Sequence, residues 1–437
     1  MDAILANSIE RLAPLGRFLY DRGAETLWER DTATLPVNLR ARRRAYRRFA
    51  SEEIAPRAIE ADRAPHDYDP RPLFAEAARR GFQSELVPPP FGKMPLVALT
   101  SRRTIFHSVL KAEEFCAACG GLGLSVLAHD LGMAPLMISG HLPTWKRWLL
   151  PLSRANMSGR PKLAAFAITE PSAGSDVEDT DGAAAARFTT TARAVSGGYV
   201  LNGQKVFISG GAYADIVSTF AVLEPTDGSK GRVDRDWTAF VVESSRQGFR
   251  VGRSEHKLGQ RACDATELFF DDVFIPTENL IGTERSGWAL NRNVLNYSRL
   301  PVAAIGLGIA RGAVEAATEF ARSARLGGRP LLSYQEVQLA LADLWLEVMA
   351  MRGMVWQAAR QKSAMQGINS ATKARCGDGA FAVTTRAMEF LADHGTLTAN
   401  RAEKTMRDAR LNQIYEGTNE VNRLGFIEAF WDSGIAQ

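Results

Sequence analysis

The sequence predicts an α+β protein of several domains, with helical segments at both ends of the chain and a β-rich segment between them. Apolar residues recur at helical spacing over residues 35–155, interrupted by a proline-rich loop at residues 87–92, and strand patterns fill residues 161–275. Long helical patterns then return over residues 288–324, 334–365, 370–394 and 400–412. A chain of 437 residues is long enough for two or three domains that share a large core.

The composition is that of an ordinary globular chain, with 46% apolar and 23% charged residues. No apolar run reaches the roughly 18 residues of a membrane span, so no membrane association is expected. The first five residues lack a basic stretch before an apolar one, so a secretory signal is not expected either. Together with only four cysteines, these features favour a cytoplasmic protein.

Six arginines crowd residues 40–48 near the start of the helical region, although the net charge is only +4. Such a run can mark a nucleic-acid-binding patch. The downstream carboxylates of Glu52, Glu53, Glu60 and Asp62 are close enough to pair with some of these arginines on a helix surface. We therefore favour a solvated helix face over a nucleic-acid partner.

Cys116 and Cys119 form a C-x-x-C pair, a spacing that occurs in metal and redox sites. They continue a helical pattern that starts near Lys111, and neither a second cysteine pair nor a histidine cluster accompanies them. A buried helix face is the better interpretation, and no metal site is expected.

The β-rich segment begins with an alternating strand pattern at residues 162–168. Pro171 and Gly174 then break the strand into a tight loop, in which Thr169 and Ser175 offer hydroxyl groups to a ligand.

A second β pattern covers residues 199–211 and contains the dipeptide Asn202-Gly203. Because this dipeptide is a strong signal for a tight turn, the segment is predicted to be a hairpin that turns there. Further strands are expected at residues 237–243 and 266–270.

Near the C-terminus, Glu416 stands between Tyr415 and Gly417, after the basic helical run at residues 406–410. Gly417 and Thr418 allow a sharp turn, so the Glu416 carboxylate is expected to project from a helix end. In an apolar setting such a carboxylate has a raised pKa and is a candidate general base.

In this order and at this spacing, these segments resemble the acyl-CoA dehydrogenase family. Residues 257–261, 270–276 and 406–418 also match, and the resemblance extends from about residue 35 to about residue 432. It implies an N-terminal α-helical domain, a middle β-barrel domain and a C-terminal four-helix bundle. The corresponding boundaries are 1–34 for a helical extension, 35–160, 161–285 and 286–437.

The resemblance also implies FAD, bound between the β domain and the bundle. The matching positions for flavin contacts are the backbone at Phe166 and Ile168, the hydroxyls of Thr169 and Ser209, and the aromatic ring of Phe207. Arg325, Gln335, Thr418 and Glu420 match other FAD contacts.

The implied reaction is α,β-dehydrogenation of an acyl thioester, acyl-CoA or acyl carrier protein (ACP), to the trans-2-enoyl product. Glu416 matches the base that takes the α-proton, while FAD takes the β-hydride, because no side chain accepts hydride. Some relatives carry the base at the position of Ser298, which cannot serve here. Ser175, Asn296, Arg299 and Gly417 match positions near the substrate or the base, although Arg299 could also be a helix-surface cation.

Two segments depart from the family pattern, at residues 324–328 and at residues 389–395, where Asp393 replaces a small residue. Both correspond to contacts with the pyrophosphate and adenosine of FAD across a subunit interface. The expected partners are an electron-transfer flavoprotein and further copies of the chain, as a homotetramer or homodimer, with a heteromer as an alternative. Oxidase, desulfinase, partner-subunit and DNA-binding roles on the same fold are the alternative functions.

Overall fold

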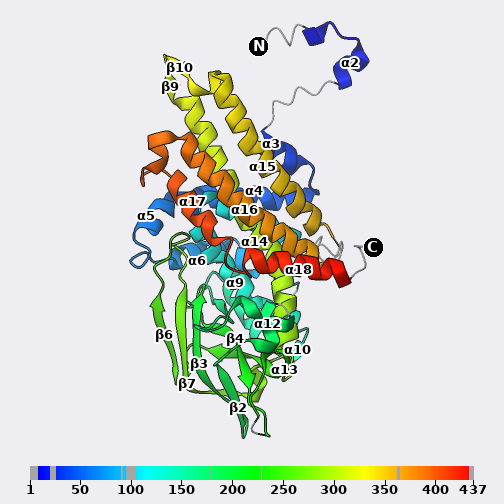
Figure 1. The fold of residues 1–437 in the computed structure, drawn as a ribbon, viewed down its shortest axis with the longest axis vertical. Coiled ribbons are helices and arrows are strands. Elements are labelled where there is room, and N and C mark those ends of the chain that lie inside the picture. Colours follow the sequence, from blue (N-terminus) through cyan, green and yellow to red (C-terminus); the bar gives the residue numbers. More distant parts are fainter. Residues whose placement is uncertain are drawn as a thin grey trace. The chain divides into compact units, whose positions relative to one another are not determined.

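The computed structural model describes residues 8–19, 26–89, 92–94, 105–178, 180–227, 229–361 and 365–432 (Figure 1). Of the loop predicted at residues 87–92, residues 90 and 91 therefore lie outside the described part. The chain divides into two compact units, Met1–Arg44 and Ala45–Gln437.

The first unit contains α2 (Pro14–Leu19), α3 (Leu27–Ala33) and the beginning of α4 (Val37–Phe49). A capping box starts α3: the Thr26 hydroxyl accepts the Glu29 N–H, and the Glu29 carboxylate accepts the Thr26 N–H. These bonds satisfy amide groups that have no partner inside the helix.

The second unit begins with the end of α4 and a series of helices. After a π-helical turn at Ala50–Ile54 come α5 (Ala58–Arg63), α6 (Arg71–Arg79), α8 (Phe106–Ala118), α9 (Gly120–Ile138), α10 (Leu142–Thr144) and α11 (Leu150–Met157). Cys116 lies in α8 and Cys119 caps α9; both are buried and free, as the helix-face interpretation expects. Among the described residues, no cluster of His, Cys, Asp and Glu could hold a metal ion.

The arginine-rich segment is helical as predicted, but it does not form one solvated face. Arg43 donates to the Thr32 hydroxyl at 3.1 Å and lies over the Trp28 ring. The downstream carboxylates also pair elsewhere: Glu52 and Glu53 with Arg80, and Asp62 with Arg407. The predicted pairing was wrong because the π-helical turn and the short helices after α4 turn these acids toward α6 and toward α17 (Ala402–Leu411).

The middle of the chain forms one sheet. Its strands are β1 (Ala164–Ala167), β2 (Thr191–Val195), β3 (Gly198–Ile208), β4 (Ile216–Leu223), β5 (Trp237–Glu243), β6 (Phe249–Ser254), β7 (Thr266–Pro276) and β8 (Leu280–Ile281). The strand order is β6-β7-β3-β2-β4-β5-β8, and β1 pairs with β4 in parallel. The short helices α12 (Thr180–Ala185) and α13 (Val233–Asp236) interrupt the strands.

The predicted turn at Asn202-Gly203 was wrong, because both residues lie inside β3. The turn lies instead before Gly198, where β2 meets β3. At Gly203, with φ +144°, the register of β3 against β7 shifts in a bulge, and a side chain there would collide with Thr190. The Asn202 side chain exchanges two hydrogen bonds of 2.9 Å with Asp272 on β7. Asn202 and Gly203 therefore form a β-bulge in β3 instead of a turn.

The side chains along each strand point alternately into two hydrophobic cores, because successive residues of a strand face opposite sides of the sheet. Ala165 and Ala167 of β1 face a cluster enclosed by the sheet, whereas Ala164 and Phe166 pack in a cluster with helix α9 and with α14 (Gly287–Ser323). Helix α9 approaches β1 closely at Gly132, where a side chain would overlap the Ala164 backbone. The start of β1 therefore lies directly against a helix.

The C-terminal region returns to helices, as predicted. They are α14 (Gly287–Ser323), α15 (Gln335–Ala359), α16 (Gln366–Phe390), α17 (Ala402–Leu411) and α18 (Asn419–Asp432), with a small hairpin of β9 (Arg325–Leu326) and β10 (Arg329–Pro330) after α14 (Figure 1). Helices α14, α15 and α16 pack on one another, and α18 packs on α16.

Two helices, α9 and α14, are long and apolar enough to cross a membrane by length and composition. However, 72% and 78% of their apolar windows are buried inside the protein. This burial is that of core helices.

Candidate active site

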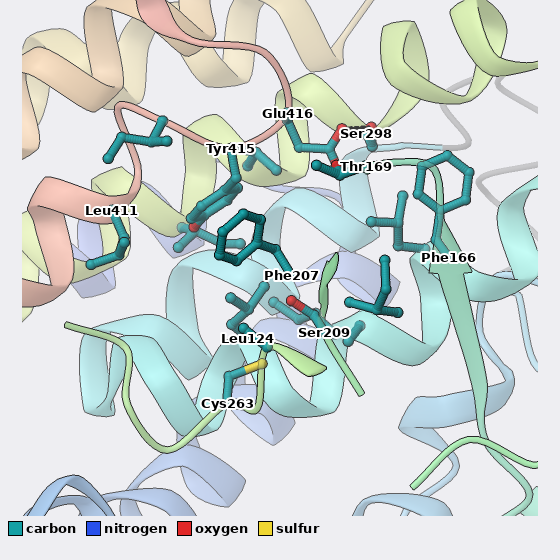
Figure 2. Close-up of a pocket in the computed structure, with 18 of the residues that line it drawn as sticks. Leu124, Phe166, Thr169, Phe207, Ser209, Cys263, Ser298, Leu411, Tyr415 and Glu416 are labelled. Carbon is teal, nitrogen blue, oxygen red and sulfur yellow. Dashed lines mark hydrogen bonds between the residues drawn. The ribbon is translucent and has the colours of Figure 1, made fainter. Parts of the chain in front are cut away.

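A cavity of about 630 Å³ opens where the sheet meets the helices. Its walls come from α9, from the segment after β1, from the end of β3, from the middle of α14 and from the loop between α17 and α18 (Figure 2). Segments far apart in the sequence therefore meet in one site.

Glu416 lines this cavity from the loop between α17 and α18, not from a helix end. Its φ is +56°, and that of Gly417 is +76°. The Asn422 amide donates to the carbonyl oxygens of residues 416, 417 and 418 at 3.2, 3.0 and 3.0 Å. The Lys373 ammonium donates to the Gly417 carbonyl at 2.6 Å. A non-glycine residue with positive φ is costly, so these bonds hold Glu416 in place.

The pKa of the Glu416 carboxyl group lies close to neutral pH. Burial raises its pKa to about 7, and the nearby Glu178 carboxylate acts in the same direction. The Ser298 hydroxyl, which donates to Glu416 Oε2 at 3.0 Å, and the cations of Arg299 and Lys373 oppose the rise (Figure 2). A pKa near the working pH is what a general base requires.

Arg299 is a buried partner of Glu178, so the surface-cation alternative was wrong. Its guanidinium donates to Glu178 Oε2 at 2.7 Å and to the Ser370 hydroxyl at 3.0 Å. Burial lowers the pKa of the adjacent Lys373 to about 8, although the Glu178 and Glu416 carboxylates oppose this. Two carboxylates, of Glu416 itself and of Glu178, therefore lie close to two cations, of Arg299 and Lys373, at this loop.

The other wall carries the residues predicted to contact a flavin. Phe166, Ile168 and Thr169 come from β1 and the residues after it, and Phe207 and Ser209 from the end of β3; all five line the cavity. Phe207 is 59% exposed and has a φ of +60°, and its ring projects into the cavity beside Tyr415 (Figure 2). An exposed aromatic ring on a strained backbone is unusual, and it offers a flat apolar face to a ligand.

The loop after β1 is fixed by a fully buried ion pair. Lys205 Nζ contacts Glu170 Oε1 at 2.9 Å and donates to the Ile168 carbonyl at 2.9 Å. The Glu170 carboxylate also accepts the backbone N–H groups of Thr189 and Thr190. Burial alone would raise the pKa of Glu170, but the Lys205 ammonium and these hydrogen bonds lower it. Thr169 and Ser175 therefore stand on a rigid loop.

The segment at residues 257–261 packs on the end of α17. A side chain at Gly259 would overlap the Arg407 carbonyl. The Gln260 side-chain amide donates to the Asp408 carbonyl at 2.8 Å and to the Tyr415 hydroxyl at 3.2 Å. These contacts position Tyr415, the residue before Glu416.

The structure brings most of the predicted site residues together. Ser175, Gly417 and Thr418 line the same cavity as Glu416. The five residues predicted to contact a flavin, here called the flavin-wall residues, also line it: Phe166, Ile168, Thr169, Phe207 and Ser209. Outside the cavity lining lie Asn296, which accepts a hydrogen bond from Asn369, and the exposed residues Arg325, Gln335 and Glu420, together with the exposed Asp393. Arg325 is on the β9–β10 hairpin and Gln335 begins α15.

Sequence reasoning missed Glu178, Lys373 and Asn422. No local pattern marks them. Glu178 and Lys373 act through contacts with segments far away in the sequence, and Asn422 bonds the carbonyls of residues 416–418 just before it. One available signal was the position of Arg299 directly before the apolar run 300–310 of α14, where a charged side chain requires a buried anionic partner.

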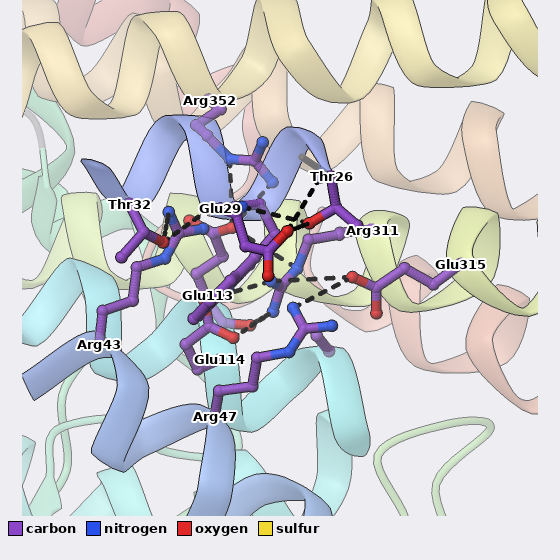
Figure 3. Close-up of polar contacts among 12 residues, drawn as sticks. Thr26, Glu29, Thr32, Arg43, Arg47, Glu113, Glu114, Arg311, Glu315 and Arg352 are labelled. Carbon is purple, nitrogen blue, oxygen red and sulfur yellow. Dashed lines mark hydrogen bonds and ion pairs between the residues drawn. The ribbon is translucent and has the colours of Figure 1, made fainter. Parts of the chain in front are cut away.

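A second buried polar cluster lies away from the cavity, between α8, α14 and α15 (Figure 3). The Arg311 guanidinium contacts Glu114 at 2.7 Å and Glu113 at 3.5 Å, and Arg352 contacts Glu113 at 3.0 Å. These four side chains are almost fully buried. The cluster joins the helices before the sheet to those after it.

Comparison with known proteins shows similarity along almost the whole chain. The family profiles of the acyl-CoA dehydrogenase N-terminal, middle and C-terminal domains match residues 38–156, 165–273 and 285–429. Cyclohex-1-ene-1-carbonyl-CoA dehydrogenase of Syntrophus aciditrophicus is 36% identical over 386 residues, which cover 86% of each chain.

Solved structures with the same fold include acyl-CoA dehydrogenases. Butyryl-CoA dehydrogenase from Megasphaera elsdenii has a TM-score of 0.81 at 29% identity, covering 91% of this chain and 99% of that one. A chain from work on the electron transferring flavoprotein of Acidaminococcus fermentans has a TM-score of 0.80 at 32% identity, covering 91% and 98%. An acyl-CoA dehydrogenase from Bacillus anthracis complexed with FAD has a TM-score of 0.79 at 25% identity, covering 92% and 68%.

Proposed function

Because the chain belongs to the acyl-CoA dehydrogenase family of oxidoreductases, which act on CH–CH groups, we propose that Glu416 is the base of its reaction. In the proposed reaction an acyl thioester is converted to the trans-2-enoyl thioester. The observation that carries this proposal is the placement of Glu416, with a pKa of about 7, in the same cavity as the flavin-wall residues.

The proposed roles follow from the geometry of the loop. The Glu416 carboxylate takes the α-proton, and the Ser298 hydroxyl, which donates to Oε2 at 3.0 Å, leaves the other carboxylate oxygen for the proton. Among the described residues no group accepts the backbone N–H of Glu416, so this N–H is available to polarise the thioester carbonyl. Arg299 and Lys373 stabilise the ionised form of the base.

The residues of the opposite wall fit FAD. Thr169 and Ser209 offer hydroxyls, the segment from Phe166 to Ile168 offers backbone groups, and the exposed Phe207 ring covers a planar group. When bound, FAD supplies the acceptor for the β-hydride, which no side chain can provide. Arg325, Gln335 and Glu420 lie outside this cavity, and we propose that they reach the adenosine end of FAD in a neighbouring subunit.

Replacement of Glu416 by Gln tests the role of the base. The amide cannot accept the α-proton, so anaerobic bleaching of the flavin by acyl-CoA should fall by at least about 10³-fold, while FAD stays bound. The control is Glu319→Gln, which changes a 73%-exposed side chain on α14. Bleaching at the unaltered rate in the Glu416→Gln enzyme would refute the assignment.

We propose acyl-CoA rather than acyl-ACP as substrate, because the relatives are named for butyryl-CoA and cyclohex-1-ene-1-carbonyl-CoA. Ser175, Asn296, Arg299 and Gly417 are the proposed residues around the substrate and the base. The proposed electron acceptor is an electron-transfer flavoprotein, and the proposed assembly is a cytoplasmic homo-oligomer with domains at residues 35–160, 161–285 and 286–437.

The exposed positions of Arg325 and Asp393 favour one alternative, a subunit that needs a different chain to complete its FAD site. Purification of the protein alone separates the two cases. Stoichiometric flavin with dye-linked dehydrogenase activity supports the homo-oligomer, whereas a colourless, inactive protein supports the heteromer.

A further inference from the structure

The loop that carries Glu416 is closed at its two ends by hydrogen bonds that lie outside the cavity lining. The backbone N–H of Asn419, the first residue of α18, donates to the Gln413 carbonyl at 2.9 Å. We call this closure the neck of the loop. Asp378 on α16 contacts the neck and does not itself line the cavity. The neck therefore fixes where the loop begins and where it ends.

A single carboxylate oxygen binds both ends of the neck. Asp378 Oδ1 accepts the side-chain amide of Gln413 at 2.7 Å and that of Asn419 at 2.8 Å. The other oxygen, Oδ2, contacts the Arg423 guanidinium on α18. Burial would raise the pKa of Asp378, but the hydrogen bonds from Gln413, Asn419 and Arg423 lower it. The carboxyl group is therefore ionised at neutral pH, and its oxygens act only as acceptors.

Asn419 connects the neck to the buried ammonium beside the base. Lys373 Nζ donates to Asn419 Oδ1 at 3.0 Å and to the Gly417 carbonyl at 2.6 Å. Asn419 also packs tightly on α16, because a Cβ at Gly377 would lie 2.8 Å from Asn419 Nδ2. A displacement of Asn419 would therefore disturb both the ammonium and the residues that flank Glu416.

We infer that Asp378 is a positioning residue for the proposed base, and that it acts through Gln413 and Asn419 on the loop that carries Glu416. This inference rests on the proposed function, because it concerns the step in which Glu416 takes the α-proton. The φ of Glu416 is +56°, a conformation that persists only where surrounding contacts enforce it. Asp378 restrains both ends of the loop through one atom, Oδ1.

Two substitutions of Asp378 separate the hydrogen bonds from the charge. Asp378→Ala removes the acceptor of both amides. Asp378→Asn removes the charge but keeps a side-chain oxygen that accepts the amides of Gln413 and Asn419. The side chain of Asp378 is 34% exposed, so neither change leaves a deeply buried cavity.

Anaerobic flavin reduction over a range of acyl-CoA concentrations gives the limiting rate and the KM. Asp378→Ala should lower the limiting rate about 10²-fold, the cost of displacing a reacting group by about 1 Å. Its KM should change less than about threefold, because Asp378 does not line the cavity. Asp378→Asn should keep the limiting rate within about threefold of the unaltered enzyme, because the hydrogen bonds of the neck remain.

The pH dependence of kcat/KM gives a second readout, which a loss of stability alone would not move. Burial is the first cause of the raised pKa of Glu416, about 7. A loosened loop admits water to this carboxyl group, so the midpoint in Asp378→Ala should move to lower pH. In Asp378→Asn the midpoint should stay in place.

Asp343→Ala is the control, because it removes an acid on α15 whose side chain is 61% exposed and contacts Arg386 at 3.5 Å. It should leave the rate and the midpoint unchanged. Gln413→Ala removes one donor of the neck and should repeat the pattern of Asp378→Ala, which keeps the test decisive if Asp378→Ala fails to hold FAD.

Three results would overturn the inference while leaving the proposed function intact. They are an unaltered limiting rate in Asp378→Ala or in Gln413→Ala, equal losses in Asp378→Ala and Asp378→Asn, and a loss confined to KM. If no acyl-CoA reduces the flavin of the unaltered holoenzyme, the proposed function itself fails.

Discussion

Glu416 and Glu178 are two carboxylates that share one buried site with two cations. The raised pKa of Glu416, about 7, comes first from burial and then from Glu178. Below this pH the Glu416 carboxyl carries a proton and cannot accept another one. The rate of α-proton abstraction should therefore rise with pH up to about 7 and then level, as seen in the pH dependence of kcat/KM for flavin reduction.

Replacement of Glu178 by Gln should move this midpoint to lower pH. The change removes a negative neighbour of Glu416 and frees the positive charge of Arg299, and both effects favour the ionised base. The control is again Glu319→Gln, for which the midpoint should stay in place. A midpoint that stays or rises in Glu178→Gln would show that Glu178 does not tune the base.

Single residues could be assigned from the sequence only where a local pattern marks them. Glu416 stands out between an aromatic residue and a glycine, and Thr169 follows a strand pattern, whereas Ser209 was indicated only by the family resemblance. Glu178 has no such mark, because its role depends on Arg299, which is 121 positions away in the chain. The same holds for Lys373, which holds the Gly417 carbonyl from α16.

At the scale of elements, α14 crosses α8 through glycines that have no room for a side chain. A Cβ at Gly308 would lie 2.5 Å from the Glu113 carbonyl oxygen, and one at Gly312 would overlap the Ala117 carbonyl. The close approach of the two helices therefore depends on both glycines.

Gly312→Ala should lower the free energy of unfolding by about 1–3 kcal/mol, because the added methyl forces the helices apart. Gly353→Ala on α15 is the matched control: nothing lies within 4 Å of its Cβ position. It should stabilise the protein by up to about 1 kcal/mol, since alanine favours a helix. Denaturant unfolding of both variants measures the difference, and equal effects would contradict the crossing argument.

The sequence predicted correctly whether most segments are helices or strands. It failed where contacts between distant segments determine the local backbone conformation. Helix α14 was expected at residues 288–324 and spans Gly287–Ser323, and the strand expected at residues 237–243 matches β5. Asn202-Gly203 misled because Asp272 on a neighbouring strand uses the Asn side chain in a bulge. No local pattern distinguishes this use from a turn.

At the scale of the whole molecule, the buried cluster around Arg311 ties the helices before the sheet to those after it. Arg311→Met should lower the free energy of unfolding by about 3–5 kcal/mol, because Glu113 and Glu114 keep their charges in a buried site. Arg47, on the rim of the cluster, contacts Glu315 at 3.4 Å and has a side chain that is 41% exposed.

Arg47→Met should therefore cost less than about 1 kcal/mol, as expected for an exposed ion pair. Thermal or denaturant unfolding of the two variants at the same pH gives the comparison. If Arg311→Met and Arg47→Met lowered the free energy of unfolding by similar amounts, burial would not determine how much each ion pair of this cluster contributes to stability.

The side-chain amide of Asn422 donates to three successive carbonyls, those of residues 416, 417 and 418. This contact matters for truncated forms of the chain. During synthesis the strands that line the cavity emerge early, whereas Asn422 emerges only with α18, after residue 416. A stop codon just before α18 would thus yield a chain that keeps residue 416 but lacks the amide that bonds the carbonyls of its loop.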